Sequence, residues 1–126
     1  MIVIGGGVIG LEMGSVYQRL GTELTVVHPT DRICPFLDKE LGTAFQRSLK
    51  KQGMNFLLNT KVLDGKNNKE KGVTVNIEGN DGKKQTLETD ICLVSIGRHA
   101  FTEGLQLDKA GLSTNDRGQV EIDDHW

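Results

Sequence analysis

The sequence lacks a strong excess of charge, a long apolar run and a cluster of cysteines. Its 15 basic and 17 acidic residues leave a formal net charge of -2, so no positive field is present to hold a nucleic-acid backbone. No apolar stretch approaches the roughly 20 residues that cross a bilayer. The apolar start also lacks the basic flank and cleavage pattern of a secretory signal. We therefore expect neither nucleic acid nor a membrane as a partner.

Cysteine is scarce and widely spaced. Cys34 and Cys92 are the only two, and they form no C-x-x-C arrangement. This spacing argues against a zinc site, a disulfide framework or a redox pair. We expect two free thiols, with Cys92 packing as a small apolar residue in a strand. No metal ligands are predicted.

The length and composition are those of one globular domain. The chain has 126 residues, of which 37% are hydrophobic and 25% charged, and 16 are glycines. This length is enough to bury a core. The prediction is a single domain over residues 1–126, with no internal repeat.

Short apolar runs alternate with helical periodicity in the first half of the chain. The runs predict buried strands at residues 1–4, 24–27 and, less clearly, 55–58. Apolar residues at helical spacing predict helices at 9–20 and 37–52, with Gly21 and Gly53 where C-terminal caps stand. Strand, helix and strand in this order are typical of a parallel crossover.

The second half of the chain has a different hydrophobic pattern. Val73, Val75 and Ile77 alternate with polar residues, and a Gly-Asn-Asp-Gly turn separates them from Leu87, which predicts an antiparallel hairpin or meander. The polar stretch 66–71 is expected to be an exposed loop. The remaining predicted elements are a buried strand at 91–96, a short helical piece at 105–110 and a strand at 119–122.

A G-x-G-x-x-G pattern stands between the first predicted strand and the first predicted helix. The three glycines are Gly5, Gly7 and Gly10, in the context that a dinucleotide-binding fingerprint requires. Gly5 would permit the tight turn, Gly7 the approach of a pyrophosphate, and Gly10 close packing of helix and strand. The N–H groups and the positive end of the helix would attract the phosphates. The alternative is a glycine turn that serves packing only.

Position 28 departs from that fingerprint. An acidic residue at the end of the second strand usually binds the adenosine ribose, and this chain has His28 there. A neutral imidazole still accepts one hydrogen bond, but losing a charge-assisted bond would weaken NAD binding by about 1.5–3 kcal/mol. The alternative is a solvent-facing histidine with no ligand role.

The glycine-rich segment resembles a known family. Residues 5–21, GGGVIGLEMGSVYQRLG, resemble the entry of the NAD-binding domain of eukaryotic dihydrolipoamide dehydrogenases, within the pyridine nucleotide-disulfide oxidoreductase family. FQRSLKKQG at 45–53, NTKV at 59–62 and IGR at 96–98 follow in that family's order and spacing. The resemblance implies a Rossmann-like three-layer α/β fold, with a parallel sheet and an antiparallel β-meander as one crossover.

The resemblance also implies an activity and its cofactors. Family members pass electrons from dihydrolipoamide through a disulfide and FAD to NAD. The flavin and interface domains are absent from this chain, so no catalytic residue is expected in it, and alone it would bind NAD(H) without turnover. The implied cofactor contacts are Gly5, Gly6, Gly7, Val8, Ile9, Gly10, Leu11, Glu12, His28, Val62 and Gly97.

The resemblance also implies the partners and the cellular location of the parent enzyme. They are its FAD and interface domains, a homodimer, the lipoyl-bearing proteins of α-keto-acid dehydrogenase or glycine cleavage complexes, and the mitochondrial matrix. The resemblance places Glu12 near the nicotinamide carboxamide, although an acidic residue near a helix start is also favoured by the dipole. Gly97 has the alternative of an ordinary strand-ending turn.

Two departures keep rival functions open. NAD-using members usually have glutamate at position 28, and the arginine and proline expected after Arg98 are replaced by His99 and Ala100. The rivals are an NADP-using reductase domain, an FAD-binding domain, and a non-catalytic truncated module. No arginine clamp for a 2′-phosphate is evident, although Arg32 lies close to His28 in sequence.

Overall fold

The computed structural model describes residues 1–125 and divides the chain into two compact units. The first runs from Met1 to Ile96, and the second starts at Gly97. The prediction of a single NAD-binding domain over residues 1–126 remains a prediction. All predicted nucleotide contacts except Gly97 fall in the first unit.

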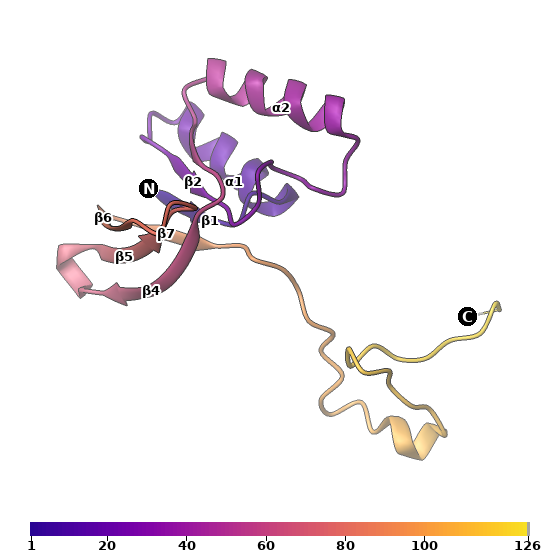
Figure 1. Cartoon of the computed structure of the whole chain (residues 1–126). Helices are drawn as coiled ribbons and strands as arrows, with labels where there is room; N and C mark the ends of the chain where they lie inside the picture. The colour runs from indigo at the N-terminus through magenta and orange to yellow at the C-terminus, as the bar shows by residue number, and fades with distance from the viewer. Residues whose placement is uncertain (126) are drawn as a thin grey trace. The chain divides into compact units, whose positions relative to one another are not determined.

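A four-stranded parallel sheet forms the centre of the first unit (Figure 1). Its strands stand in the order β3-β2-β1-β7, and all three pairings are parallel. Their bounds are Ile2–Ile4 for β1, Thr25–Val27 for β2, Asn55–Leu57 for β3 and Cys92–Val94 for β7. The predicted strands are therefore confirmed, each with shorter ends.

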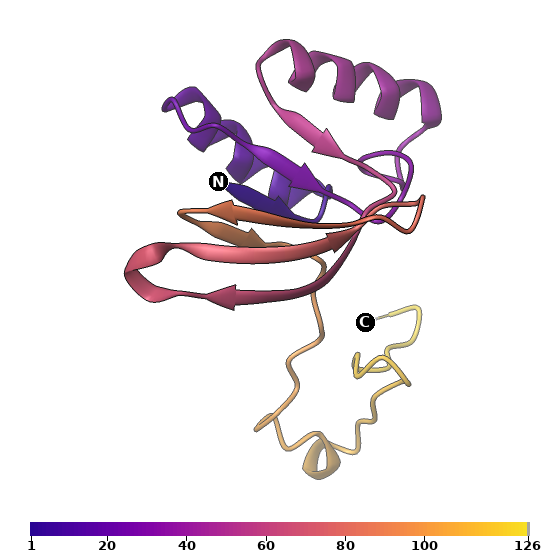
Figure 2. The same ribbon diagram turned by 60° about the vertical axis from the view of Figure 1, so that its left-hand side comes forward.

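Two helices cover one face of this sheet (Figure 2). They are α1, Val8–Arg19, and α2, Lys39–Lys51. Because side chains alternate along a strand, Val3 and Val26 point to the helices and share a core with Leu11 and Leu49. In residues 1–125, no helix is long and apolar enough to span a bilayer.

A three-stranded antiparallel sheet packs on the other face (Figure 2). Its strands are β4, Lys61–Asn67, β5, Val73–Glu78, and β6, Lys84–Thr89. Val75 and Ile77 of β5 share a second core with Ile2 and Val27 of the parallel sheet. The predicted three-layer fold is confirmed, with this meander as the crossover between β3 and β7.

The predicted loop at 66–71 is wrong in its first part. Strand β4 continues through Lys66 and Asn67, which pair with Thr74 and Val73. A 3-10 turn, Lys69–Lys71, then connects β4 to β5. The polar composition was misleading because backbone hydrogen bonds hold a strand whose side chains remain in water.

The second unit consists mostly of turns. A 3-10 helix, Leu107–Ala110, lies within the helical piece predicted at 105–110. The strand predicted at 119–122 is wrong, because only an isolated bridge joins Thr114 to Val120. The Asn115 side chain organises this turn by accepting hydrogen bonds from the N–H groups of Arg117 and Gln119. None of the described residues of this unit is buried.

Candidate functional site

The glycine-rich turn follows the carboxyl end of β1 and leads into α1. Gly5 has φ +109, and a Cβ there would collide with the Ser95 carbonyl oxygen. A Cβ at Gly10 would collide with the Gly5 carbonyl oxygen and lie 2.9 Å from Cγ1 of Val3. The turn therefore requires glycine at both positions, for the structural reasons that the motif predicts.

Gly7 is different, because its surroundings are open. It is the N-cap of α1, with φ -87° and ψ -177°, and no atom lies within 4 Å of a Cβ built there. Within residues 1–125, the Gly7 N–H donates to no acceptor. The helical hydrogen bonds begin with Leu11 N–H donating to the Gly7 carbonyl, at 3.1 Å. Free N–H groups at the positive end of a helix beside open space can bind an anion.

Hydrogen bonds to neighbouring segments hold the turn in place. The Gly5 N–H donates to the Val27 carbonyl at 2.9 Å, and the Cys34 N–H donates to the Gly6 carbonyl at 2.8 Å. The Ser95 hydroxyl lies 3.1 Å from the Ile4 carbonyl oxygen and 3.3 Å from that of Gly5. Sequence reasoning missed Ser95, and the available signal was a hydroxyl two residues before Gly97 in the otherwise apolar run 91–96.

His28 contacts the turn directly. The Gly6 N–H donates to Nδ1 of His28 at 3.0 Å, so this nitrogen carries no proton and the proton is on Nε2. A Cβ at Gly6 would lie 3.1 Å from Cγ of His28 and 3.2 Å from Cγ2 of Ile33. Burial lowers the pKa of the imidazole. The ring is therefore half-buried beside Gly6 rather than solvent-facing, as the alternative assumed, and its ligand role remains a prediction.

The Nε2 atom of His28 is buried and has no hydrogen-bond partner among the described residues. A buried donor without an acceptor is unfavourable, and such atoms are uncommon in folded proteins. The predicted contact between His28 and a ribose remains a prediction. What the structure adds is a hydrogen bond from the glycine-rich turn to this side chain.

Glu12 lies in the second turn of α1 and is exposed. It lines a cavity of about 550 Å³ between α1 and the segment that leads into α2. The other lining residues are Val8, Leu11, Ser15, Val16, Arg19, Cys34, Phe36, Leu37 and Phe45. The structure thus places three predicted contact residues, Val8, Leu11 and Glu12, at one cavity, while Ile9 is exposed on α1 outside its lining.

Val62 and Gly97 are not brought to the turn by any recorded contact. Val62 is half-buried against the second core and pairs with Ile77. Gly97 has φ +144 and begins the second unit. Their predicted parts in the cofactor surface remain predictions.

A second cavity, of about 1240 Å³, lies near the amino ends of the parallel strands. Met1, Thr25 and Asn55 from those strand starts line it together with residues 85–90 of β6 and its end. None of the predicted site residues lines this cavity. The glycine turn is at the carboxyl end of β1, where ligands bind in open α/β sheets, so the larger cavity is separate from the candidate site.

Both cysteines are free thiols outside any metal-binding cluster. Burial raises the pKa of Cys34 and of Cys92, so both remain protonated at neutral pH. In the described part of the chain, no group of three or more His, Cys, Asp or Glu side chains is placed to hold a metal.

Comparison with known proteins identifies the family to which the chain belongs. The family model described as pyridine nucleotide-disulphide oxidoreductase matches residues 1–126. The chain belongs to the pyridine nucleotide-disulphide oxidoreductase family. FAD and NAD are the cofactors of the dihydrolipoamide dehydrogenases in this family.

Two similar members of the family are dihydrolipoamide dehydrogenases by name. One, from Chaetomium thermophilum, is 50% identical over 127 residues and covers 99% of this chain. The other, the mitochondrial dihydrolipoyl dehydrogenase of Caenorhabditis elegans, is 50% identical over 128 residues and covers 100%. The crystal structure of LpdA from Mycobacterium tuberculosis is 29% identical, with a TM-score of 0.80 over 97% of this chain and 26% of its own.

The match covers only part of each relative. The chain spans 25% of the Chaetomium protein and 26% of the Caenorhabditis protein. The family assignment therefore applies to a segment of about a quarter of those enzymes.

Proposed function

We propose that this chain is the NAD-binding part of a dihydrolipoamide dehydrogenase, and that alone it binds NAD(H) without oxidising dihydrolipoamide. The open N-terminus of α1 carries the proposal, since Gly7 faces empty space and has no side-chain cap. The identity of about 50% to named dihydrolipoamide dehydrogenases supports this ligand over others.

The chain's own residues supply a cradle for a diphosphate. The N–H groups of Gly7, Val8 and Ile9 precede the first helical hydrogen bond and point out of the start of α1. They act with the helix dipole, so no lysine is needed to hold the phosphates. NAD supplies the hydride acceptor when it is bound, and this domain's task is to orient the nicotinamide.

His28 and Glu12 are assigned to the two ends of the ligand. His28 stands at the end of β2, where the adenosine ribose binds in dinucleotide folds. Glu12 is one turn further along α1 than the phosphate cradle and is free to meet the carboxamide. Val62 and Gly97 complete the proposed cofactor surface.

The exposed apolar surface of α1 supports docking to the rest of a parent enzyme. Val8, Ile9 and Val16 are each about half exposed, although α1 also buries Leu11 in the core. Apolar residues on an outward helix face are normally covered by another surface. The proposed partners are the FAD and interface domains, within a homodimer that serves lipoyl-bearing proteins of α-keto-acid dehydrogenase or glycine cleavage complexes in the mitochondrial matrix.

Calorimetric titration of the purified chain with NAD, NADH, NADP and FAD tests the proposal. We expect saturable binding of NAD and NADH and much weaker binding of NADP and FAD. A turnover assay with dihydrolipoamide and NAD should give no reduction by the isolated chain. Saturation by none of the four ligands would support a non-catalytic module instead.

NADP is the second candidate ligand because of one observation. The Nε2–H of His28 is a buried hydrogen-bond donor without a partner, and a 2′-phosphate would supply an acceptor if the ring turned outward. Against this, the Arg32 guanidinium donates to the Pro35 carbonyl at 2.9 Å and, within residues 1–125, forms no hydrogen bond with His28. Tighter binding of NADP than NAD in the same titration would favour this candidate.

Restoring an acid at position 28 separates the two ligands further. His28→Glu should tighten NADH binding by about tenfold, since a carboxylate makes charge-assisted bonds to ribose hydroxyls. The same variant should weaken NADP binding through repulsion of the 2′-phosphate. Unchanged NADH affinity would show that position 28 does not face the ribose.

A further inference from the structure

The phosphate-binding turn depends on a titratable acceptor. The Gly6 N–H has one acceptor in the structure, Nδ1 of His28 at 3.0 Å. Only a neutral imidazole offers a lone pair on that atom, because both ring nitrogens of an imidazolium are donors. Gly6 directly precedes the N-cap residue Gly7, so the bond fixes the backbone that leads into the cradle.

In its present position, a protonated ring would have no acceptor for either of its N–H groups. A proton on Nδ1 would face the Gly6 N–H, donor against donor, and the buried Nε2–H already lacks a partner. The ring lies against the turn, because a Cβ built at Gly6 would be 3.1 Å from Cγ of His28. A protonated ring therefore cannot keep both its position and the Gly6 bond.

No nearby charge compensates a protonated ring. The glycine turn itself has no ionisable side chain, and the neighbouring segments carry Asp31, Arg32, Cys34 and Lys61. None of these groups forms a hydrogen bond or ion pair with His28 in residues 1–125. Burial alone lowers the pKa of the imidazole, which agrees with a ring that the structure holds neutral.

We propose that His28 is a positioning residue that makes the diphosphate turn sensitive to pH, holding Gly6 when neutral and releasing it when protonated. The proposal rests on the proposed function for its effect on NAD, but the release of Gly6 is a property of the free chain. Loss of the Gly6 bond loosens the turn, because it removes one of the hydrogen bonds that hold it, beside those of the Gly5 N–H and the Gly6 carbonyl. A less ordered turn binds more weakly because ordering it opposes association.

Two-dimensional NMR of the 15N-labelled chain between pH 7.5 and pH 5.0 tests the release. The Gly6 amide resonance should shift with the same midpoint as the His28 ring nitrogens. Nδ1 should report an unprotonated acceptor at the upper pH. In parallel, calorimetry should show NAD binding about three- to tenfold weaker at the lower pH, the range expected for one lost hydrogen bond.

Two variants distinguish the positioning role of His28 from other effects of low pH on the chain. In His28→Asn the side-chain oxygen takes the place of Nδ1 and accepts from Gly6 without titrating in this range. Its Gly6 resonance and NAD affinity should therefore change little with pH. In His28→Ala the acceptor is gone, so the chain at pH 7.5 should resemble the unmodified chain at pH 5.0 in both measurements.

The outcomes are distinguishable. A Gly6 resonance that stays fixed while the His28 ring titrates would overturn the proposal, and so would a ring that stays neutral down to acid unfolding. Equal loss of NAD affinity in His28→Asn and the unmodified chain would overturn the effect on binding. Absence of NAD binding at every pH would contradict the proposed function alone, because the NMR titration still decides whether Gly6 is released.

Discussion

The N-termini of α1 and α2 differ in whether a side chain accepts hydrogen bonds from their first N–H groups. Each helix start leaves N–H groups without helical partners. At α2 the Asp38 carboxylate accepts from Glu40 N–H at 2.8 Å and from Leu41 N–H at 3.4 Å. At α1 the cap is Gly7, with no side-chain hydrogen bond and no acid in the first turn. The difference shows which helix start is free for an external anion.

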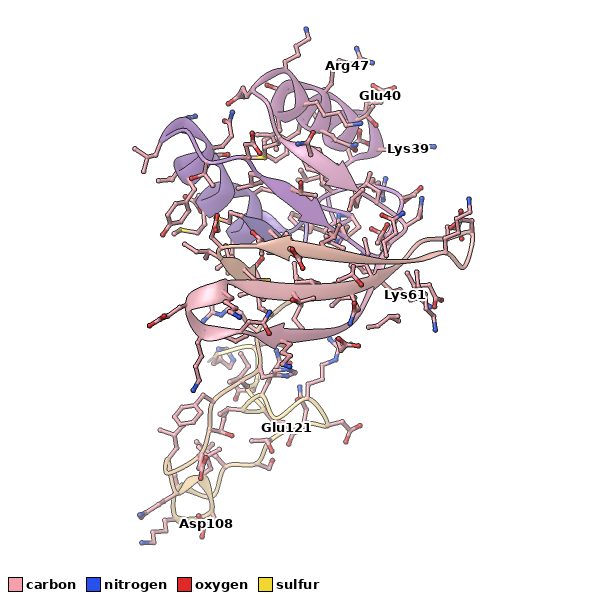
Figure 3. The ribbon with its side chains drawn as sticks, turned by 90° about the vertical axis from the view of Figure 1, so that its left-hand side faces the viewer. Lys39, Glu40, Arg47, Lys61, Asp108 and Glu121 are labelled. Atoms are coloured by element: carbon pink, nitrogen blue, oxygen red, sulfur yellow. The ribbon has the colours of Figure 1, made fainter. Side chains whose placement is uncertain are left out.

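The outer faces of the two helices both carry charged and apolar side chains. On α2 the charged side chains of Lys39, Glu40 and Arg47 project from the helix (Figure 3). On α1 the exposed positions include Ile9 and Val16, which are apolar. Helix α2 also exposes the apolar side chains of Leu41 and Phe45, so the clear difference between the two helices is at their N-termini.

Giving α1 an acidic N-cap like that of α2 should have the largest effect on NAD affinity. Gly7 has the extended backbone of an N-cap residue, so Gly7→Asp would place a carboxylate at the helix start. We expect NAD affinity to fall at least about 100-fold, equivalent to about 2.7 kcal/mol, because the carboxylate fills the cradle and repels the phosphates. Calorimetry measures this loss, and thermal unfolding should show no loss of stability.

The neutral variant Gly7→Asn serves as the control for charge. It caps the same N–H groups without a negative charge. Its loss of affinity should be smaller than that of Gly7→Asp. Normal NAD binding by both variants would refute the assignment of this helix start as the phosphate site.

Gly10 distinguishes packing from binding within the same motif. Gly10→Val should lower the free energy of unfolding by about 2–3 kcal/mol, because its side chain would collide with the turn and with Val3. Urea unfolding measures the loss. The matched change Gly7→Ala meets nothing within 4 Å and should cost less, about 0.5–1 kcal/mol, because alanine is a poorer N-cap than glycine. Equal stability of the two variants would contradict the packing role of Gly10.

Removing the cap of α2 should affect stability alone. Asp38→Ala leaves the Glu40 and Leu41 N–H groups without their acceptor and should cost about 1 kcal/mol of unfolding free energy. NAD affinity should be unchanged, because this helix start is already self-capped. A marked loss of NAD binding by this variant would mean that α2 also contacts the ligand.

The smallest expected effect is on stability in mild acid. The folded chain holds the pKa of His28 below its ordinary value of 6.5, so the unfolded chain binds a proton more readily. The contribution is present above about pH 6.5 and is lost as the pH falls through the lower, folded value. Urea unfolding at pH 7.5 and 5.5 should show a greater loss for the unmodified chain than for His28→Asn. An identical loss in both would contradict this contribution.

The sequence predicted the strands and helices of the first unit well. Short apolar runs and helical spacing are set by neighbouring residues, and β1, α1, β2, α2, β3 and β7 all lie where these patterns indicate. The second unit was predicted less well. Residues 119–122 alternate like a strand, but only Val120 is bridged, to Thr114, because a strand also requires a partner.

The candidate site was predicted in part. The fingerprint indicated Gly5, Gly7 and Gly10, since the spacing of glycines around a turn is a local property. Ser95 was missed because it is about 90 residues away in sequence and reaches the turn only through the pairing of β1 with β7. The hydrogen bond between Gly6 and His28 was missed for the same reason, across 22 residues.

By itself the sequence determined the order of elements, the glycine turn and the resemblance to a nucleotide-binding family, because these depend on local periodicity and on residue types at fixed spacing. Only the tertiary structure decided which of the three glycines faces open space, which backbone N–H groups are already taken, and where the His28 ring lies. These depend on atoms that the parallel pairing of β1 with β2 and β7 brings together from distant parts of the chain.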